Sequence, residues 1–565
     1  DAVEYLYTKH GTAKDMKEAV RQSVEAGLNI RCTFRSPDSY VLPLRELVKE
    51  GGRMAIHTFA AIYIGTYDVS LKVFEFTNRK KFHEVDHIRS RQELGKGAYG
   101  TGTIGYEQVE ELCETLAQFK EIMESYKVDS YEVCAAAALR DTTNEIFVLD
   151  QIYLRTGFRV KVLSNSEHRF ISYKAVAGSP VFEEMIKTSA AVVDVGGASV
   201  QITLFRNGKM ITTQHMEAGI MRLRNLLGDR GYSLKMYENQ IEEYVNKKLE
   251  GFRAMYMNTP VDYLILISDY ADGLVKKIEE KGGKSRQVKL DKFSKFIDKL
   301  LKKTLEEITA ELNLSDEREP LIIPALVLYK MMAQNVNPKE VWVPGANIQD
   351  GMAFDYAQHN KLLASTHDFD ADVISAATFL SEHYHSFSPH IQTLSKLSIK
   401  IFDAMKQEHG LGKRARLLLQ VATILHDCGK YVSFAEASES TYHIIMSSEI
   451  IGLTHQEREI VAQIVRYNTL PLDPYEEVAD VLSQEEYLCV AKLSAILRVA
   501  NALDQSHKQK FKNIRIAVRE RKLVITVEAF EDIALEQALF DAKTSYFENV
   551  YSMKPVLKEK RIYNY

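Results

Sequence analysis

The chain has 565 residues, of which 45% are hydrophobic and 26% are charged, and this length suits three or four domains. Its formal net charge of −5 excludes a global attraction to nucleic acid, so a polyanion would need a local basic cleft. Five scattered cysteines, no apolar run of membrane-spanning length and no recognisable signal peptide predict a cytoplasmic protein without a disulfide framework or a membrane anchor.

Residues 1–53 differ in character from the rest of the chain. The stretch EAVRQSVEAGLNIRCTFRSPDSYVLPLRELVKEGG, residues 18–52, resembles a fragment of family 3 glycoside hydrolases, and Asp1 would match their nucleophile. A fragment cannot assemble the second carboxylate or the sugar pocket, so we expect no glycosidase activity. Because Met54 looks like a natural start, we expect residues 1–53 to be an appended segment.

A strand–turn–strand pattern follows at residues 59–76 and recurs at residues 190–210, AAVVDVGGASVQITLFRNGKM. In the first unit the turn is Gly65-Thr66. Two such units, each followed by alternating strands and helices, predict a duplicated α/β architecture with a cleft between its halves.

In the second unit Asp194 stands near the end of the first strand, and Gly196 and Gly197 follow it. Successive N–H groups in a glycine turn can bind phosphate oxygens, and an Asp beside them can hold a metal-bound or attacking water. The alternative is an ordinary hairpin with a permissive turn, because a single D-x-G-G motif is a weak signal.

Between the two units, residues 106–126 have helical periodicity, and residues 129–138 and 158–163 are predicted strands. Arg140 follows the first of these strands, where it would be either a phosphate ligand or a surface ion pair. Glu167 lies in the first turn of the next predicted helix. It would be a capping residue there or, if it faces a cleft, a general base.

Several stretches in the same order resemble the exopolyphosphatase / guanosine pentaphosphate phosphohydrolase (Ppx/GppA) family. They are IYIGTYDVSLKV, AAAALRDTTN, RTGFRVKVLSNSEHRFISYKAV, VVDVGGASVQI and EAGIMRLRNLL. The resemblance covers about nine-tenths of the chain, from Met54 on. It implies an α/β, two-lobed actin/hsp70/sugar-kinase-like (ribonuclease H-like) fold, then an all-α HD-like domain and a small α/β C-terminal module.

The resemblance also implies a reaction, in which water attacks a terminal phosphoryl group. Glu167 would be the catalytic base, and Asp194 would hold magnesium or the attacking water. The residues that it implies for phosphate binding are Gly65, Thr66, Arg140, Gly196, Gly197, Ala198, Ser199, Gly219 and Arg222.

The chain departs from the family pattern in the predicted cleft. Tyr63 replaces an Asp, Gln201 replaces a Glu, and Glu93 and Gln349 replace arginines. Tyr67-Asp68 replaces an Asn-Ser pair, and the third loop, residues 268–272, has little phosphate-binding character. These departures leave open an alternative function, a catalytically weakened regulatory protein that binds polyphosphate or a nucleotide.

Helices alone are predicted after residue 358. His390, the pair His426-Asp427 and Asp504 each stand on an amphipathic pattern, in the order typical of HD-type metal phosphohydrolases. They would bind a metal, as in an HD-domain nucleotide hydrolase, or form a buried His–Asp hydrogen-bond network without one; the sequence leaves both open. Beyond them, residues 513–520 and 522–529 predict a hairpin, and residues 533–543 a helix.

We therefore predict a magnesium-dependent phosphohydrolase acting on inorganic polyphosphate or on guanosine pentaphosphate, without nucleic-acid or membrane partners. A homodimer is one alternative for an oligomeric state that the sequence leaves open. The predicted domains are residues 1–53 (appended segment), 54–183 (lobe I), 184–358 (lobe II), 359–510 (helical HD-like domain) and 511–565 (C-terminal module).

Overall fold

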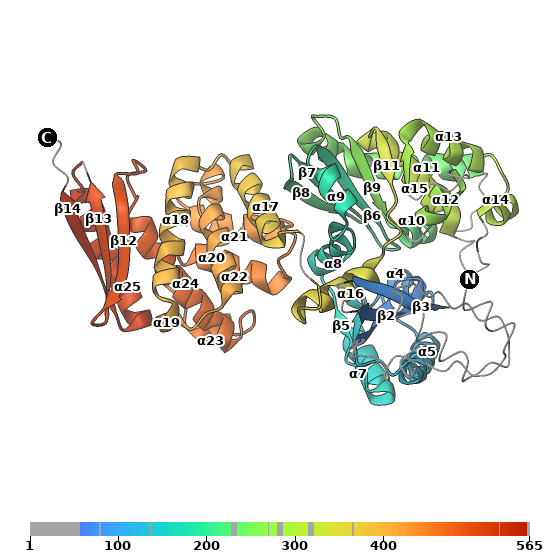
Figure 1. Ribbon diagram of the computed structural model, residues 1–565, viewed down its shortest axis with the longest axis horizontal. Helices are drawn as coiled ribbons and strands as arrows, with labels where there is room; N and C mark the ends of the chain where they lie inside the picture. Colours follow the sequence, from blue (N-terminus) through green and yellow to red (C-terminus); the bar gives the residue numbers. More distant parts are fainter. Residues whose placement is uncertain are drawn as a thin grey trace, which may run out of the picture.

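The computed structural model describes residues 57–561 apart from 78–80, 136, 228–233, 269, 279–285, 313, 315–320, 364–366 and 530. The predicted appended segment, residues 1–53, lies outside the described residues. Figure 1 shows two α/β lobes at one end of an elongated molecule, a helical region in the middle and a small sheet near the C-terminus. None of the described helices has the length and apolar character that crossing a bilayer would require.

The first lobe is built on a sheet with the strand order β3-β2-β1-β4-β5. Its strands are β1 (His57–Ile64), β2 (Asp68–Thr77), β3 (Lys81–Arg91), β4 (Ser130–Ala135) and β5 (Lys161–Val162). The pairs β1–β2 and β2–β3 are antiparallel, whereas β1–β4 and β4–β5 are parallel. The predicted unit at residues 59–76 is the β1–β2 hairpin.

Helices cover both faces of this sheet. Those of the first lobe are α4 (Leu94–Gly100), α5 (Tyr106–Ser125), α6 (Ala137–Arg140), α7 (Glu145–Thr156), α8 (Asn165–Ala177) and α9 (Pro180–Ile186). On β1, Ala60 and Ile62 pack against α5 and α7, whereas Phe59 and Ala61 pack against α16 (Ile348–His359). Because both faces are buried, β1 has a continuous run of largely apolar residues from Phe59 to Ile64 instead of alternating with polar ones.

The second lobe repeats this topology. Its strands are β6 (Ser189–Val195), β7 (Val200–Arg206), β8 (Lys209–Met216), β9 (Tyr263–Ile267), β10 (Gln287–Lys289) and β11 (Glu340–Trp342). The order β8-β7-β6-β9-β11 matches β3-β2-β1-β4-β5, with the same change from antiparallel to parallel pairing, and β10 adds an edge strand. The predicted duplication of an α/β unit is confirmed.

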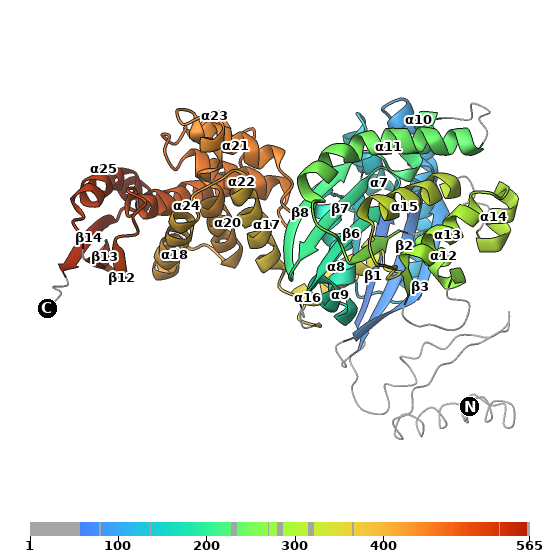
Figure 2. The same cartoon turned by 90° about the horizontal axis from the view of Figure 1, so that it is seen from above.

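Two helices cross between the lobes. Helix α16 follows the strands of the second lobe but packs on β1, while α8 follows the strands of the first lobe and contacts both α16 and β6. Figures 1 and 2 show both helices where the lobes meet. The other helices of the second lobe are α10 (Ile220–Leu227), α11 (Leu234–Tyr256), α12 (Ala271–Ile278), α13 (Leu290–Leu300), α14 (Leu305–Leu312) and α15 (Ile322–Val336).

The N-terminal turn of α8 is also tied to the helical region. Glu449, in the loop after α21 (Ala437–Ser447), accepts a hydrogen bond from the Ser166 hydroxyl at 3.3 Å and forms an ion pair with Arg169. The Arg169 side chain is only 2% exposed. Since a buried guanidinium needs a partner, this ion pair fixes α8 against the helical region.

The helical region places its predicted His and Asp residues at helix ends. Its helices are α17 (Phe369–His383), α18 (Ser388–Ala404), α19 (Lys406–His409), α20 (Lys413–Leu425), α21, α22 (His455–Arg466), α23 (Tyr475–Val478) and α24 (Gln484–Ala502). His390 lies on α18 as predicted, but His426-Asp427 follows α20 and Asp504 follows α24, so their placement on helices was wrong. After α20, Gly429 packs directly on the backbone of Ala437 and Thr441, where a Cβ would not fit.

The C-terminal part forms a sheet with the order β12-β13-β14. Strands β12 (Phe511–Arg519) and β13 (Lys522–Ala529) form the antiparallel hairpin that the sequence pattern predicts. Helix α25 (Ala534–Tyr551) extends beyond the predicted 533–543, and β14 (Lys554–Arg561), which no pattern predicted, pairs in parallel with β13.

Two predicted strands are shorter than expected, and the one at residues 158–163 appears only as β5, Lys161–Val162. The pattern at residues 129–138 gives β4 only as far as Ala135, and Ala137 and Ala138 belong to helix α6, which contains Arg140. Alanine favours a helix, and it lacks the branched side chain that favours a strand. Arg140 therefore lies in a short helix after the strand and not at the end of the strand itself.

Candidate functional site

A cavity of about 140 Å³ opens between the two lobes. It is several times the roughly 30 Å³ that one water molecule occupies in the liquid, so it suits a group of phosphoryl size. Its lining comes from both lobes and comprises Tyr63, Gly65, Thr66, Tyr67, Asp68, Arg89, Arg91, His168, Ser172, Asp194, Val195, Gly196, Gly197, Ile220, Ile267, Ser268, Tyr270, Leu321, Asn347 and Ile348.

The turns after β1 and β6 have the same hydrogen bond and face each other. The Gly65 N–H donates to the Asp68 carbonyl at 2.9 Å, and the Gly196 N–H donates to the Ser199 carbonyl at 3.0 Å. A Cβ on Gly197 would lie 3.1 Å from the Cβ of Thr66, so the turns nearly touch. The predicted pair of matching glycine turns thus lines one cavity.

The segment after the third strand of each lobe supports the turn. The Gly95 N–H donates to the Thr66 carbonyl at 2.8 Å, and the Gly219 N–H donates to the Ala198 carbonyl at 3.0 Å. A Cβ on Gly219 would lie 2.2 Å from the Ser199 nitrogen, so only glycine fits there. Gly219, Ala198 and Ser199 therefore shape the second turn and are not part of the cavity lining.

His168 and two of the sequence departures form a hydrogen-bonded group in the cleft. The Tyr63 hydroxyl lies 3.0 Å from His168 Nε2, and the Gln201 amide nitrogen lies 3.4 Å from Nδ1. Burial, aided by the charges of Arg140 and Arg169, lowers the pKa of His168 to about 3. His168 is therefore neutral at physiological pH, and sequence reasoning had missed it.

Glu167, the predicted base, caps its own helix. Its Oε2 accepts the Ser164 N–H at 3.0 Å, Ser164 Oγ accepts the Glu167 N–H at 3.2 Å, and Lys161 Nζ lies 3.2 Å from Oε1. Burial alone would raise the pKa of Glu167, but the Ser164 hydrogen bonds and the Lys161 charge outweigh burial and lower it. Glu167 is an ionised carboxylate next to His168 in the chain, and it is not among the cavity-lining residues.

Arg140 and Arg222 meet beside the cavity and not in its lining. Arg140 Nε lies 3.1 Å from one oxygen of Asp141, and Arg222 lies 3.6 Å from the other. Arg222 also stacks over Tyr99 and lines a neighbouring hollow of about 770 Å³. Both arginines thus have carboxylate partners, as expected of surface ion pairs.

Two other arginines reach the cavity and were not predicted. Arg89 lies 3.3 Å from Asp68, and Arg91 donates from Nε to Glu93 at 3.1 Å. Arg224, from the second lobe, lies 3.4 Å from the same Glu93 oxygen. Arg89 and Arg91 lie on the edge strand β3 and Arg224 lies on helix α10. Because only the assembled lobes bring these elements together, the spacing of the three arginines in the sequence carries no signal of this arrangement.

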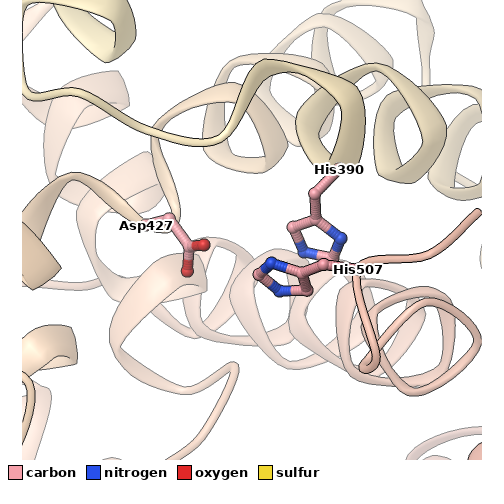
Figure 3. A group of neighbouring side chains, drawn as sticks. All are labelled: His390, Asp427 and His507. Carbon is pink, nitrogen blue, oxygen red and sulfur yellow. The ribbon is translucent and has the colours of Figure 1, made fainter.

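A second group of polar side chains lies in the helical region. One potential ligand atom from each of His390, Asp427 and His507 lies within 4.8 Å of those of the other two. Figure 3 shows the three side chains converging from separate segments. His390 and Asp427 are buried, and His507 is half-buried. Of these three, sequence reasoning had missed His507.

The other two predicted members of this group take different places. Asp504 Oδ2 lies 2.8 Å from His390 Nδ1 and so orients that ring from behind. His426 Nδ1 lies 2.8 Å from the Thr423 carbonyl, and its Nε2 lies 3.3 Å from Asp427 Oδ1. Burial lowers the pKa of His426 to about 4. The four predicted residues thus lie together, with His507 as a fifth.

Comparison with protein-family models shows which family the chain belongs to. The model of the Ppx/GppA phosphatase family matches residues 73–360, and that of Ppx/GppA phosphatase domain III matches residues 374–543. The chain belongs to the Ppx/GppA phosphatase family. This membership confirms the predicted family and the predicted enzyme class.

Individual Ppx/GppA relatives are distant. The chain is 20% identical to proteins of Photobacterium profundum and Vibrio cholerae, both described as guanosine-5'-triphosphate,3'-diphosphate pyrophosphatase. The alignments cover 78% and 83% of this chain, and 86% and 92% of the relatives. The crystal structure of an exopolyphosphatase from Cytophaga hutchinsonii is 18% identical, with a TM-score of 0.49, and it covers 55% of this chain and 100% of that chain.

The departures from the Ppx/GppA pattern have structural partners in this chain. Gln349, where the family has an arginine, is buried; its Nε2 donates to the Ala61 carbonyl at 2.8 Å and to the Ser70 carbonyl at 3.1 Å. It therefore joins α16 to β1 and β2. Glu93, at another arginine position, joins arginines of both lobes. At Glu93 and Gln349 an arginine of the family pattern is thus exchanged for a contact within the protein.

The Ppx/GppA resemblance implies magnesium, and the cavity lining fits it. Mg²⁺ is usually bound by one or two carboxylates together with waters and substrate phosphates. The carboxylates among the described lining residues are Asp68 and Asp194, and Thr66 and Ser268 add hydroxyl groups. Asp68 and Asp194 are therefore the candidate magnesium ligands in this lining.

Proposed function

We propose that the protein is a phosphohydrolase that releases the terminal phosphate of inorganic polyphosphate or of guanosine pentaphosphate. One observation carries this proposal: two glycine turns with the same hydrogen bond meet across a cavity of phosphoryl size, beside Asp194. Family membership and the names of the relatives agree with it. Both substrates end in a phosphoanhydride, and the cavity has room for such an end group.

The chain's own residues would bind and orient the substrate. The turns at Gly65 and Gly196 would bring backbone donors to the phosphate oxygens, and Arg89 and Arg91 would supply positive charge at the rim. Asp194 would orient the attacking water and bind Mg²⁺. When bound, Mg²⁺ would neutralise the charge that develops on the transferred phosphoryl group.

Glu167 is proposed as the base that activates this water. Its lowered pKa keeps the carboxylate ionised at neutral pH, as a proton acceptor must be. His168, the next residue, lines the cavity. To act, the Glu167 carboxylate would have to leave the Ser164 N–H and Lys161 and turn toward the cavity.

Phosphate release from long-chain polyphosphate and from guanosine pentaphosphate, each with Mg²⁺, tests the proposal. We expect release from at least one substrate, and a loss of on the order of 100-fold or more in Glu167→Gln and Asp194→Asn. Glu486→Gln is a matched control, because Glu486 forms the same capping box with Ser483 on α24. No release by the wild-type protein rejects the function, and an unchanged rate in Glu167→Gln rejects only the base.

The group Tyr63–His168–Gln201 favours a second candidate, a regulatory protein that binds polyphosphate or a nucleotide without hydrolysing it. Two positions that carry acids in the family are neutral here and are hydrogen-bonded to a neutral histidine. This candidate predicts saturable binding of polyphosphate, measured by fluorescence anisotropy, together with no phosphate release. A cytoplasmic location and the oligomeric state remain predictions from the sequence.

A further inference from the structure

We propose that His390, Asp427 and His507 form a binding site for a divalent transition metal in the helical region, separate from the cleft between the lobes. The potential ligand atoms lie within 4.8 Å of one another. Ligands on opposite sides of one Zn²⁺ ion are about 4.4 Å apart at most, since each bond is about 2.0–2.2 Å. A small side-chain adjustment would therefore bring all three onto one ion.

His390 is oriented as metal-binding histidines usually are. Its Nδ1 lies 2.8 Å from Asp504 Oδ2, and since a carboxylate can only accept, Nδ1 carries the proton. Nε2 then has a lone pair, yet this nitrogen is fully buried and has no hydrogen-bond partner among the described residues. Histidines that bind a metal usually donate one ring N–H to a carboxylate and bind the metal through the lone pair of the other nitrogen, which is the arrangement of His390.

His426, next to Asp427, also has one protonated ring nitrogen and one that carries a lone pair. Its Nδ1 lies 2.8 Å from the Thr423 carbonyl, which again can only accept, so Nδ1 is protonated. The lone pair of Nε2 then lies 3.3 Å from Asp427 Oδ1, and Nε2 has no hydrogen-bond partner in the described part of the chain. Two acceptors in contact repel each other unless a cation lies beside them. Lys430 Nζ lies 2.7 Å from the other oxygen, Asp427 Oδ2, and a metal ion would add a cation on the side of Oδ1 and His426.

His507 closes the site from a loop and leaves a path to solvent. It adopts a positive φ of 56°, and its N–H donates to the Asp504 carbonyl at 2.9 Å. Its ring stacks on His390 with centroids 3.8 Å apart. Lys430 pairs with the other Asp427 oxygen at 2.7 Å, and its side chain is 40% exposed. An ion could therefore enter past Lys430 and His507.

The ligand types indicate which metal would bind. Imidazole suits Zn²⁺, Fe²⁺ and Ni²⁺, whereas Mg²⁺ and Ca²⁺ prefer all-oxygen sites. Two histidines and one carboxylate leave coordination positions for water or an anion, as in catalytic zinc sites. The site would thus discriminate against the magnesium that we propose for the cleft.

Titration of the chelator-treated full-length protein tests the site without any substrate. Zn²⁺ binding is measured by calorimetry, and Co²⁺ binding by its visible absorption, which is sensitive to nitrogen ligands. We expect the wild-type protein to bind one equivalent of Zn²⁺ or of Co²⁺ at this site. His507→Ala and Asp427→Asn should weaken binding at least tenfold, and His443→Ala, an exposed histidine of α21, should leave it unchanged.

His507 and Asp427 are both tested because one is half-buried and the other is replaced by a side chain of the same shape, so at least one variant should fold. Circular dichroism of each variant checks this. The proposal is overturned if the wild-type protein binds neither Zn²⁺ nor Co²⁺ stoichiometrically. It is also overturned if both folded variants bind as tightly as the wild type. Neither result bears on phosphate release in the cleft.

Discussion

The cleft and the helical cluster use buried histidines in opposite ways. In the cleft, both ring nitrogens of His168 have a partner, the Tyr63 hydroxyl and the Gln201 amide. In the cluster, His390 and His426 each bond through Nδ1 and leave a buried Nε2 without a hydrogen-bond partner among the described residues. Since buried polar atoms are normally satisfied, the unpaired Nε2 atoms agree with the metal site proposed above, whereas the paired ring of His168 agrees with a structural role.

Gly219→Ala should have the largest effect on the cleft while leaving the helical cluster unchanged. The new methyl group would lie 2.2 Å from the backbone of Ala198 and Ser199, which cannot move without deforming the second turn. We expect a loss of about 3 kcal/mol in the free energy of unfolding and a large loss of phosphate release. Urea denaturation and the phosphate assay measure both. Zinc binding should be unchanged, and a parallel loss of zinc binding would show that the regions are not independent.

Asp504→Asn should affect the cluster and spare the cleft. It removes the negative charge that orients His390 through Nδ1 while keeping the size of the side chain. Loss of such an outer-shell partner typically costs about 10- to 100-fold in metal affinity, which calorimetry with Zn²⁺ would detect. Asp403→Asn, which changes an exposed ion pair with Arg416, is the control. Equal affinities in the two variants would contradict the role of Asp504.

His168→Gln tests whether the neutral, hydrogen-bonded ring of His168 makes the stability of the protein depend on pH. The pKa of His168 is about 3 in the folded protein, below the usual 6.5, so the unfolded chain binds more protons and stability falls as the pH drops below 6.5. Between pH 7 and pH 5 this contribution is about 2 kcal/mol. The wild type should lose that much more than the variant in urea titrations at the two pH values. A loss of the same size in both proteins would show that His168 is not the group responsible.

Gly273→Ala should have the smallest effect and bear on neither region. Gly273 lies inside α12, and a Cβ there would meet no atom within 4 Å. Replacing an unhindered helical glycine by alanine should stabilise the protein by about 0.5–1 kcal/mol. Thermal unfolding would show a raised midpoint, and phosphate release and zinc binding should not change. A destabilised variant would mean that this helix is crowded in solution.

The elements that could be predicted from the sequence are those marked by residues adjacent in the chain. Gly65 and Gly196 follow apolar strands, and a glycine at such a place predicts a turn wherever the strand packs. The duplication follows from seeing that pattern twice. Glu167 shows the limit of this reasoning, because a Glu three residues after Ser164 is equally the signature of a capping box, which is the contact that the structure contains.

Residues that depend on tertiary contacts were not predicted. His168 enters the cleft only because α8 packs against the second lobe, and Arg89 and Arg91 lie on a strand whose charged residues read as a solvated edge. His507 follows Asp504 by three residues, but it reaches the cluster through a left-handed backbone conformation that a histidine seldom adopts. The spacing of residues in a chain does not reveal such a bend.

Helix α8 contacts both the cleft and the helical region, at Glu449. His168, on one of its turns, lines the cavity, and Arg169 and Ser166 on the same turn bind Glu449 of the helical region. A rotation of α8 that turned Glu167 toward the cavity would therefore pull on Glu449.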